Sequence, residues 1–188
     1  MPAVPELSAE HFRRVMACVP TSVAVVAGLV DGVPKGLSVG TFVPVSLNPP
    51  LVGFFVANTS RSWPPIRSTG SFCVSVLGHD QAGLSSRFAA SEADKFDGVE
   101  WRPTQSGNPV LVGVVAFVDC DIERVVETGD HVLVLGRVLE MGVEAGQTPL
   151  VHHRSSYARV AESTEWDTAA NGPEAKLDGP GSVHHNLW

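Results

Sequence analysis

Histidines, arginines and hydroxyl side chains are the residues of this sequence that could do chemistry, and the histidines raise the question of a metal site. The chain has seven histidines, with adjacent pairs at 152–153 and 184–185. Adjacent side chains on a strand point to opposite faces, so one ion does not readily take both members of a pair. Neither a His-x-His nor an HExxH spacing occurs in the sequence. We therefore predict that the protein has no metal site.

His131 is the histidine that best suits a role in a binding site. It follows Gly129 and Asp130 at the start of a predicted strand, where a loop meets the rim of a sheet. Imidazole is the side chain whose charge changes near physiological pH. The pattern is equally typical of a turn residue that begins a strand. Two interpretations stay open, a turn residue or an imidazole at the mouth of a pocket.

An anion site is suggested by "TSRSWPPIR" (59–67), which combines hydroxyls, Arg61 and a predicted helix start. Backbone N–H groups at a helix N-terminus and a guanidinium together can bind a phosphate. Arg87, in "SSRFA", could reach the same anion or be a solvated charge on a helix. Hydroxyl caps are common, so the pattern also fits a helix start without a ligand.

The stretch "KGLSVGTF" (35–42) alternates like a strand, yet it carries Gly36 and Gly40. Glycine weakens a strand and often marks the close approach of a ligand or of another backbone. The sequence leaves two explanations: a packing compromise, or a flat ligand against the backbone with Ser38 and Thr41 at its edge.

The elements that must position these residues are mainly short strands. The patterns predict strands at 22–29, 35–42, 51–57, 71–78, 110–129 (bent at Gly113), 129–141 and 149–153, with a hairpin turn at Asp31-Gly32. Short helices are predicted at 8–20, 60–70 and 79–90, capped by Ser8, by Ser60 or Ser62, and by Asp80. Residues 91–109 are expected to form a polar loop. Many strands with few helices between them favour an antiparallel barrel over an α/β sheet.

Composition sets the broad class. With 188 residues, 44% of them hydrophobic, the chain is expected to form one domain over 1–160, followed by a polar tail at 161–188 whose apolar end docks on the body or on a second subunit. The net charge of −7 argues against nucleic acid or an anionic membrane surface as a partner. The absence of a long apolar run and of a signal pattern predicts a cytoplasmic protein. Cys18, Cys73 and Cys120 are predicted to be small core residues.

Several stretches, taken together and in this order, resemble the flavin reductase-like family of split-barrel flavin-binding domains. They run from about Phe12 to Tyr157 and include "VPTSVAVVAG", "GVPKGLSVGTFVPVSLNPPLVGFFV", "SRSWPPIRSTGSFCVSVL", "SSRFA", "DKFDGVEW", "GNPVL", "DCDIERVVETGDHVLVLGRV" and "PLVHHRSSY". The resemblance implies a mainly β fold with short helices, a six-stranded antiparallel split barrel of Greek-key-like order, and a homodimer.

The resemblance also implies an activity. Similar proteins use NADH or NADPH to reduce FMN or FAD, and the reduced flavin diffuses to a separate oxygenase that hydroxylates an aromatic or phenolic substrate. Hydride transfer is the cofactors' own chemistry, so the lack of an acid–base motif agrees with this function. Two alternatives remain on the same fold: a non-catalytic flavin-binding or redox-sensing protein, and an oxidase that retains its flavin.

The site residues follow from the resemblance, position by position. The isoalloxazine ring would lie against Lys35, Gly36, Leu37, Ser38, Gly40 and Thr41, with Phe55, Val56 and Ala57 on the neighbouring strand. The phosphate would be held by Arg61 and Ser62, with Arg87 and Phe88 closing that side. The catalytic residue would be His131, near the nicotinamide. The dinucleotide would also contact His152, His153, Arg154, Ser155 and Tyr157.

Overall fold

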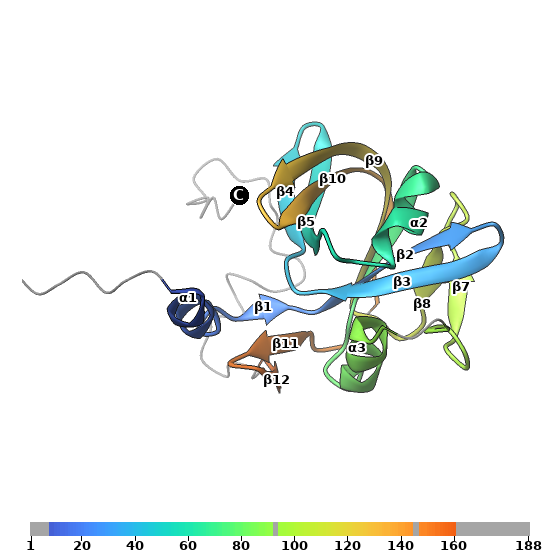
Figure 1. Cartoon of the computed structure of the whole chain (residues 1–188). Coiled ribbons are helices and arrows are strands. Elements are labelled where there is room, and N and C mark those ends of the chain that lie inside the picture. Colours follow the sequence, from blue (N-terminus) through green and yellow to red (C-terminus); the bar gives the residue numbers. More distant parts are fainter. Residues whose placement is uncertain (1–7, 92–93, 145–146, 161–188) are drawn as a thin grey trace, which may run out of the picture.

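A seven-stranded antiparallel sheet forms the body of the molecule and curves into an open barrel (Figure 1). The computed structural model describes residues 8–91, 94–144 and 147–160. Across the sheet the strands are β3 (Val33–Val39), β2 (Ala24–Val30), β6 (Ser71–Val76), β9 (Ala116–Thr128), β10 (His131–Val143), β5 (Pro50–Ala57) and β4 (Val43–Leu47). The edge strands β3 and β4 are consecutive in the chain, and among the described strands no ladder joins them. The barrel is therefore split between its two edges.

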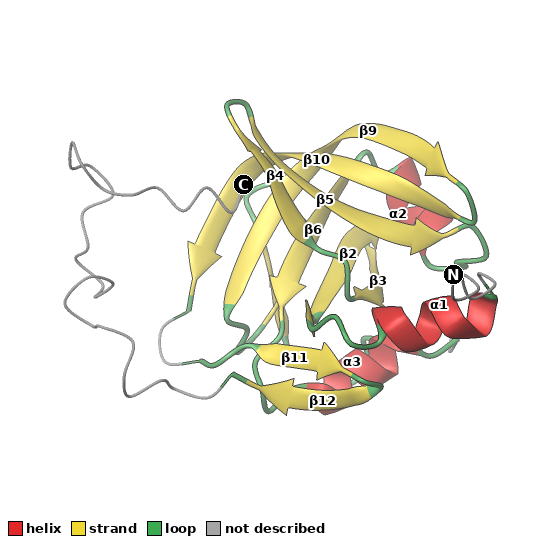
Figure 2. Ribbon diagram, turned by 90° about the vertical axis from the view of Figure 1, so that its left-hand side faces the viewer, coloured by secondary structure: helices red, strands yellow, loops and turns green. Residues whose placement is uncertain are grey.

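Within the described residues, two smaller sheets and three helices complete the fold (Figure 2). One small sheet holds β1 (Thr21–Ser22), β11 (Leu150–His153) and β12 (Ser156–Arg159), and the other holds β7 (Trp101–Pro103) and β8 (Pro109–Leu111). The helices are α1 (Ala9–Met16), α2 (Trp63–Ser68) and α3 (Ala82–Ala89). Helix α2 packs on β2, β3 and β6, whereas α3 packs on β2 and β3.

Apolar side chains form two clusters, because successive residues of a strand point to opposite faces of the sheet. Inside the barrel, the Phe54 ring meets Trp63 at 5.6 Å and Phe72 at 5.2 Å, both edge-on. Under α3, the rings of Phe88 and Phe96 meet edge-on at 4.9 Å. Strand β3 separates the clusters, with Leu37 and Val39 in the first cluster and Gly36 and Ser38 facing α3.

Several local predictions are confirmed, as is the mainly β split-barrel class. The Ser8 hydroxyl accepts the His11 N–H at 3.1 Å and so caps α1. Asp31 and Gly32 both have positive φ, at 49° and 77°, as a two-residue hairpin turn requires. Cys73 and Cys120 are fully buried, and burial together with nearby Asp119 raises the pKa of both thiols.

Three predicted strand and loop boundaries were wrong. The stretch 35–42 ends as a strand at Val39, and residues 43–47 pair with β5 as a further strand, so the sheet has seven strands and not six. The predicted strand 110–129 is interrupted at Gly113, where φ is +74°, and separates into β8 and β9. The predicted loop 91–109 contains β7 and several buried residues, because it folds back beneath α3.

Two side-chain predictions were also wrong. Cys18 is exposed, because it follows α1, in which no residue is buried. Asp80 does not cap α3, because the helix begins two residues later, with Gln81 at the N-cap position and no side-chain capping bond.

Helix α1 stands away from the barrel in both views (Figures 1 and 2). Three apolar residues of this helix, Phe12, Val15 and Met16, and Val19 just after it are all exposed. None of the described helices has the length and apolarity that a membrane span needs. The predicted tail, including its apolar end, falls outside the residues that the structure describes.

Candidate functional site

A large cavity lies between β3 and β5, with the start of α2 at one end and the end of α3 alongside. Its volume is about 810 Å³, which suits a ligand with several fused rings and a side chain. Thirteen of the predicted site residues line it: Lys35, Gly36, Leu37, Ser38, Gly40, Thr41, Phe55, Val56, Ala57, Arg61, Ser62, Phe88 and His131. The structure thus brings together residues that stand almost 100 positions apart in the chain.

The charge of this cavity is opposite to that of the chain. Lys35, Arg61 and Lys95 line it, and among the described lining residues none is acidic, although the chain carries a net charge of −7. Positive side chains with no carboxylate among them favour an anionic ligand. Arg61 and Lys95 lie at the α2 end of the cavity together with the hydroxyls of Ser60 and Ser62.

Lys95 is the functional candidate that the sequence did not reveal. Its ammonium donates to the Ser62 hydroxyl at 3.1 Å and to the Phe88 carbonyl at 2.8 Å. The residue is only 8% exposed, and among the described residues no carboxylate pairs with it. Burial lowers the pKa of this ammonium, since a charged form without a counter-ion is disfavoured inside a protein. A bound anion would supply that counter-ion.

Ser60, and not Ser62, provides the capping bond at the start of α2. The Trp63 N–H donates to the Ser60 hydroxyl at 3.3 Å, whereas Ser62 makes no capping bond and accepts from Lys95. The Ser62 hydroxyl therefore belongs to the cavity.

The contacts around Gly36 and Gly40 show whether these glycines serve packing or a ligand. A Cβ on Gly36 would lie 2.7 Å from a carbon of the Phe88 ring, so the ring occupies the space that a side chain would need. At Gly40 a Cβ would come within 3.1 Å of the Thr21 hydroxyl. Gly36 lines the cavity, but packing against α3 already requires glycine there. The glycine is consequently no independent sign of a ligand.

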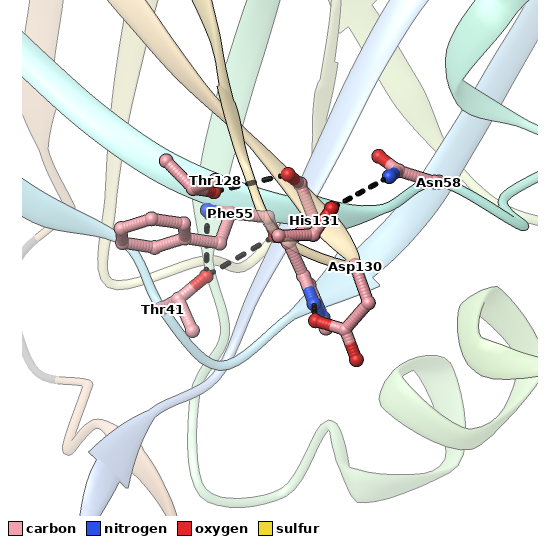
Figure 3. A network of polar contacts seen from close by, with 7 residues as sticks. Thr41, Phe55, Asn58, Thr128, Asp130 and His131 are labelled. Carbon is pink, nitrogen blue, oxygen red and sulfur yellow. Dashed lines mark hydrogen bonds and ion pairs between the residues drawn. The ribbon is translucent and has the colours of Figure 1, made fainter.

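The β5 wall is joined to the chain segment after β3 by hydrogen bonds (Figure 3). The Phe55 N–H donates to the Thr41 hydroxyl at 2.9 Å, and that hydroxyl donates to the Phe55 carbonyl at 3.3 Å. One side chain thereby satisfies two backbone groups at an otherwise open edge of the sheet. Thr41 holds the two walls together across the split.

His131 lies at the rim of the cavity, where β10 begins beside the end of β5 (Figure 3). Its Nδ1 is 2.7 Å from a carboxylate oxygen of Asp130. A carboxylate only accepts, so Nδ1 carries the proton and Nε2 is left for another partner. The hydrogen bond from His131 lowers the pKa of the Asp130 carboxyl. The side chains are 45% and 95% exposed, respectively, so this end of the cavity is open to solvent.

The turn that carries His131 is fixed by backbone contacts (Figure 3). The Asn58 amide donates to the Gly129 carbonyl at 3.1 Å, and the Asn58 N–H donates to the Asp130 carbonyl at 3.0 Å. The Thr128 hydroxyl donates to the His131 carbonyl at 3.0 Å. Both interpretations of His131 hold, since it begins a strand and also lines the mouth of a pocket.

A second, smaller cavity of about 200 Å³ adjoins the first and shares Ser38, Val39, Gly40 and Ala89 with it. Two more of the predicted residues, His152 and Tyr157, line this second cavity. Their rings meet edge-on at 5.9 Å on neighbouring strands of the small sheet.

Four predicted residues line neither cavity. Arg87 is exposed and donates to the Asp97 carbonyl, so it ties α3 to the following loop. Arg154 and Ser155 form the turn between β11 and β12, with φ of 49° and 61°, and His153 precedes that turn. Across the described ranges of the chain, no group of three or more His, Cys, Asp or Glu residues is arranged to hold a metal ion.

Comparison with known proteins agrees with this geometry. Residues 16–161 match the family described as flavin reductase like domain. A flavin reductase of Pseudomonas putida is 44% identical over 153 residues, covering 81% of this chain and 90% of that protein. The reductase subunit HsaB of a flavin-dependent monooxygenase from Rhodococcus jostii is 37% identical over 158 residues, covering 84% and 81%.

A solved structure is similar throughout the body. The NADH:FAD oxidoreductase SgcE6 of Streptomyces globisporus, in complex with NAD and FAD fragments, has a TM-score of 0.80 and 30% sequence identity, covering 88% of this chain and 100% of that one. The predicted resemblance and enzyme class are thus confirmed, and the chain belongs to the flavin reductase-like domain family.

Proposed function

We propose that this protein reduces FMN or FAD with NADH or NADPH, and that the cavity between β3 and β5 binds the flavin. The observation that carries the proposal is a cavity lined by three cations and by no described acidic residue, in a chain that is acidic overall. A flavin nucleotide needs a flat slot, donors for its ring edge and cations for its phosphate, and the lining residues offer all three.

The roles of the residues follow from their places in the cavity. Residues 35–41 and 55–57 would hold the ring between the two walls. Arg61, Ser62 and Lys95 would hold the phosphate at the α2 end. When both are bound, the nicotinamide supplies a hydride that the flavin accepts.

His131 would bind the nicotinamide at the open rim. Asp130 orients its ring, so that Nε2 is the nitrogen presented to a ligand. His152 and Tyr157 would contact the dinucleotide from the second cavity. The protein itself moves no proton in this scheme; it aligns two rings and stabilises negative charge on one of them.

We further infer that the reduced flavin leaves and serves a separate oxygenase that acts on an aromatic or phenolic substrate. The similarity to a monooxygenase reductase subunit supports this partnership. An exposed rim suits a product that must depart. Such a supply route would operate in the cytoplasm, where nicotinamide donors are available.

We also propose a homodimer. Three apolar residues of α1 and Val19 just after it, between 43% and 58% exposed, form a face that a second copy would cover. Val15→Glu is expected to convert the dimer to a monomer in size-exclusion chromatography with light scattering. A wild-type protein that is monomeric at all concentrations would contradict the dimer.

The activity is tested by mixing the purified protein with NADH or NADPH and excess FMN or FAD, and following the nicotinamide absorbance. The expected result is oxidation of the donor that requires added flavin and turns over many equivalents. No flavin-dependent turnover with either donor would contradict the proposal. A yellow protein that survives dialysis and ignores both donors would favour a flavin-binding or sensing role.

A further inference from the structure

Three hydroxyl groups from distant parts of the chain form a continuous line that ends at the main cavity. The Tyr157 hydroxyl, on β12, donates to the Ser85 hydroxyl of α3 at 2.9 Å. The Ser85 oxygen lies 3.2 Å from the Ser38 oxygen of β3. Ser85 is only 3% exposed, whereas Ser38 lies where the two cavities meet.

The proton of each hydroxyl can be assigned from the donors available. A hydroxyl has one proton to donate, and Tyr157 donates its own to Ser85. Among the described residues, Ser85 has no acceptor other than Ser38, so its proton must point to Ser38. A buried hydroxyl proton without an acceptor would cost free energy. Ser38 therefore accepts from Ser85 and keeps its own proton for the cavity.

The direction is no longer fixed without the Tyr157 hydroxyl. Tyr157 is 42% exposed, so a solvent molecule could take the place of its hydroxyl and accept the Ser85 proton. Ser85 would then have a free lone pair, and Ser38 could donate to it. The cavity would face an acceptor oxygen where it now faces a donor. The hydroxyl of Tyr157 thus decides, from the far side of α3, which kind of hydrogen bond Ser38 offers to a ligand.

We propose that Tyr157 is a positioning residue that acts through Ser85 to make Ser38 a hydrogen-bond donor to the edge of a bound heteroaromatic ring. This inference rests on the proposed flavin site. The edge of a flavin ring carries carbonyl oxygens and ring nitrogens that accept hydrogen bonds, and a donor there favours the electron-rich, reduced ring. The role differs from direct contact with the dinucleotide, because it needs the hydroxyl of Tyr157 and not its ring.

The test uses Tyr157→Phe, which keeps the ring and removes only the hydroxyl. Binding of FMN is measured by quenching of flavin fluorescence, together with the visible absorption band of the bound FMN. We expect Tyr157→Phe and Ser38→Ala each to weaken FMN binding by roughly three- to tenfold, the range of one neutral hydrogen bond. Both variants are expected to shift the absorption band in the same direction.

The double variant Ser38→Ala/Tyr157→Phe is expected to match Ser38→Ala alone, because Tyr157 acts only through Ser38. Ser86→Ala is the matched control, since its hydroxyl donates to the Ala82 carbonyl on the exposed side of the same helix. If Tyr157→Phe loosens the β11–β12 hairpin in thermal unfolding, Ser85→Ala interrupts the same line from α3 and should likewise add nothing to Ser38→Ala.

The outcomes separate this inference from the proposed function. A wild-type protein that binds and reduces FMN, with Tyr157→Phe unchanged or with losses that multiply in the double variant, would overturn the inference alone. A wild-type protein that binds no flavin would overturn both.

Discussion

The two ends of the main cavity are built differently. At the α2 end, Lys95 is buried and is bonded to oxygens of two other segments. At the rim, His131 and Asp130 form an exposed pair on a turn. An interior charge is held in one geometry by packing, while an exposed pair is weakly held and screened by solvent. The buried end is suited to anchoring a ligand, and the rim to exchanging one.

The largest effect is expected at the buried anchor. Lys95→Met keeps the apolar stem and removes the charge, and we expect FMN binding to weaken by about ten- to a hundredfold, the range of a charged hydrogen bond. Fluorescence quenching measures the dissociation constant. Riboflavin, which has the same ring without a phosphate, is the matched ligand control and should lose little. An equal loss for riboflavin would mean that Lys95 supports the fold and holds no phosphate.

The next effect concerns packing of the β3 wall. Gly36→Ala places a Cβ against Phe88 and should reduce the free energy of unfolding by about 1–3 kcal/mol, measured by denaturant titration. Gly40→Ala, whose nearest contact would be the Thr21 hydroxyl at 3.1 Å, is the control and should cost less. If Gly36→Ala instead left stability unchanged and abolished FMN binding, glycine at 36 would serve the ligand and not the helix.

At the rim, His131→Ala is expected to raise the KM for NADH by roughly tenfold, through loss of one ligand contact. The dissociation constant for FMN should change little, because the positions proposed for the ring and the phosphate are at other parts of the cavity. Steady-state kinetics and fluorescence quenching measure the two quantities. His79→Ala, an exposed histidine away from both cavities, is the control. Equal losses of NADH and FMN binding would assign His131 a structural role.

The smallest effect is expected for Asp130→Asn, about two- to threefold on the KM for NADH, because an exposed pair orients the ring only weakly. The pKa of the Asp130 carboxyl is lowered. The carboxylate therefore stays charged when the pH falls past the ordinary pKa of an aspartate, and it is protonated only when the pH falls through the lowered pKa. The difference between wild type and Asp130→Asn should therefore persist as the pH falls from neutrality to the ordinary pKa of an aspartate, and shrink only below it. A difference that vanishes near neutral pH would contradict this.

Local sequence signals predicted the exposed turn and the strands better than the buried anchor. Asp31-Gly32 and the residues around His131 carry turn chemistry in their own types, and both turns lie where they were expected. Lys95 stands in a polar stretch and gives no local sign of burial. Its environment depends on Phe88 and Ser62, which are brought over it by two different helices. Burial of one polar residue is a property of the packing of distant segments, which periodicity does not report.

The glycines of the stretch 35–42 also show a limit of prediction from sequence. Their presence in this stretch predicted a close approach, and the close approach exists at Gly36, but the partner is the Phe88 ring. A glycine in a strand pattern can indicate that another group comes close, but it does not identify that group.

The most direct test of the central claim is a crystal structure of the protein with FMN bound. We expect the phosphate between Arg61, Ser62 and Lys95, and the ring between residues 36–41 and 55–57, with Ser38 donating to its edge. An FMN bound outside this cavity, or one with its phosphate at the His131 rim, would contradict the proposed site.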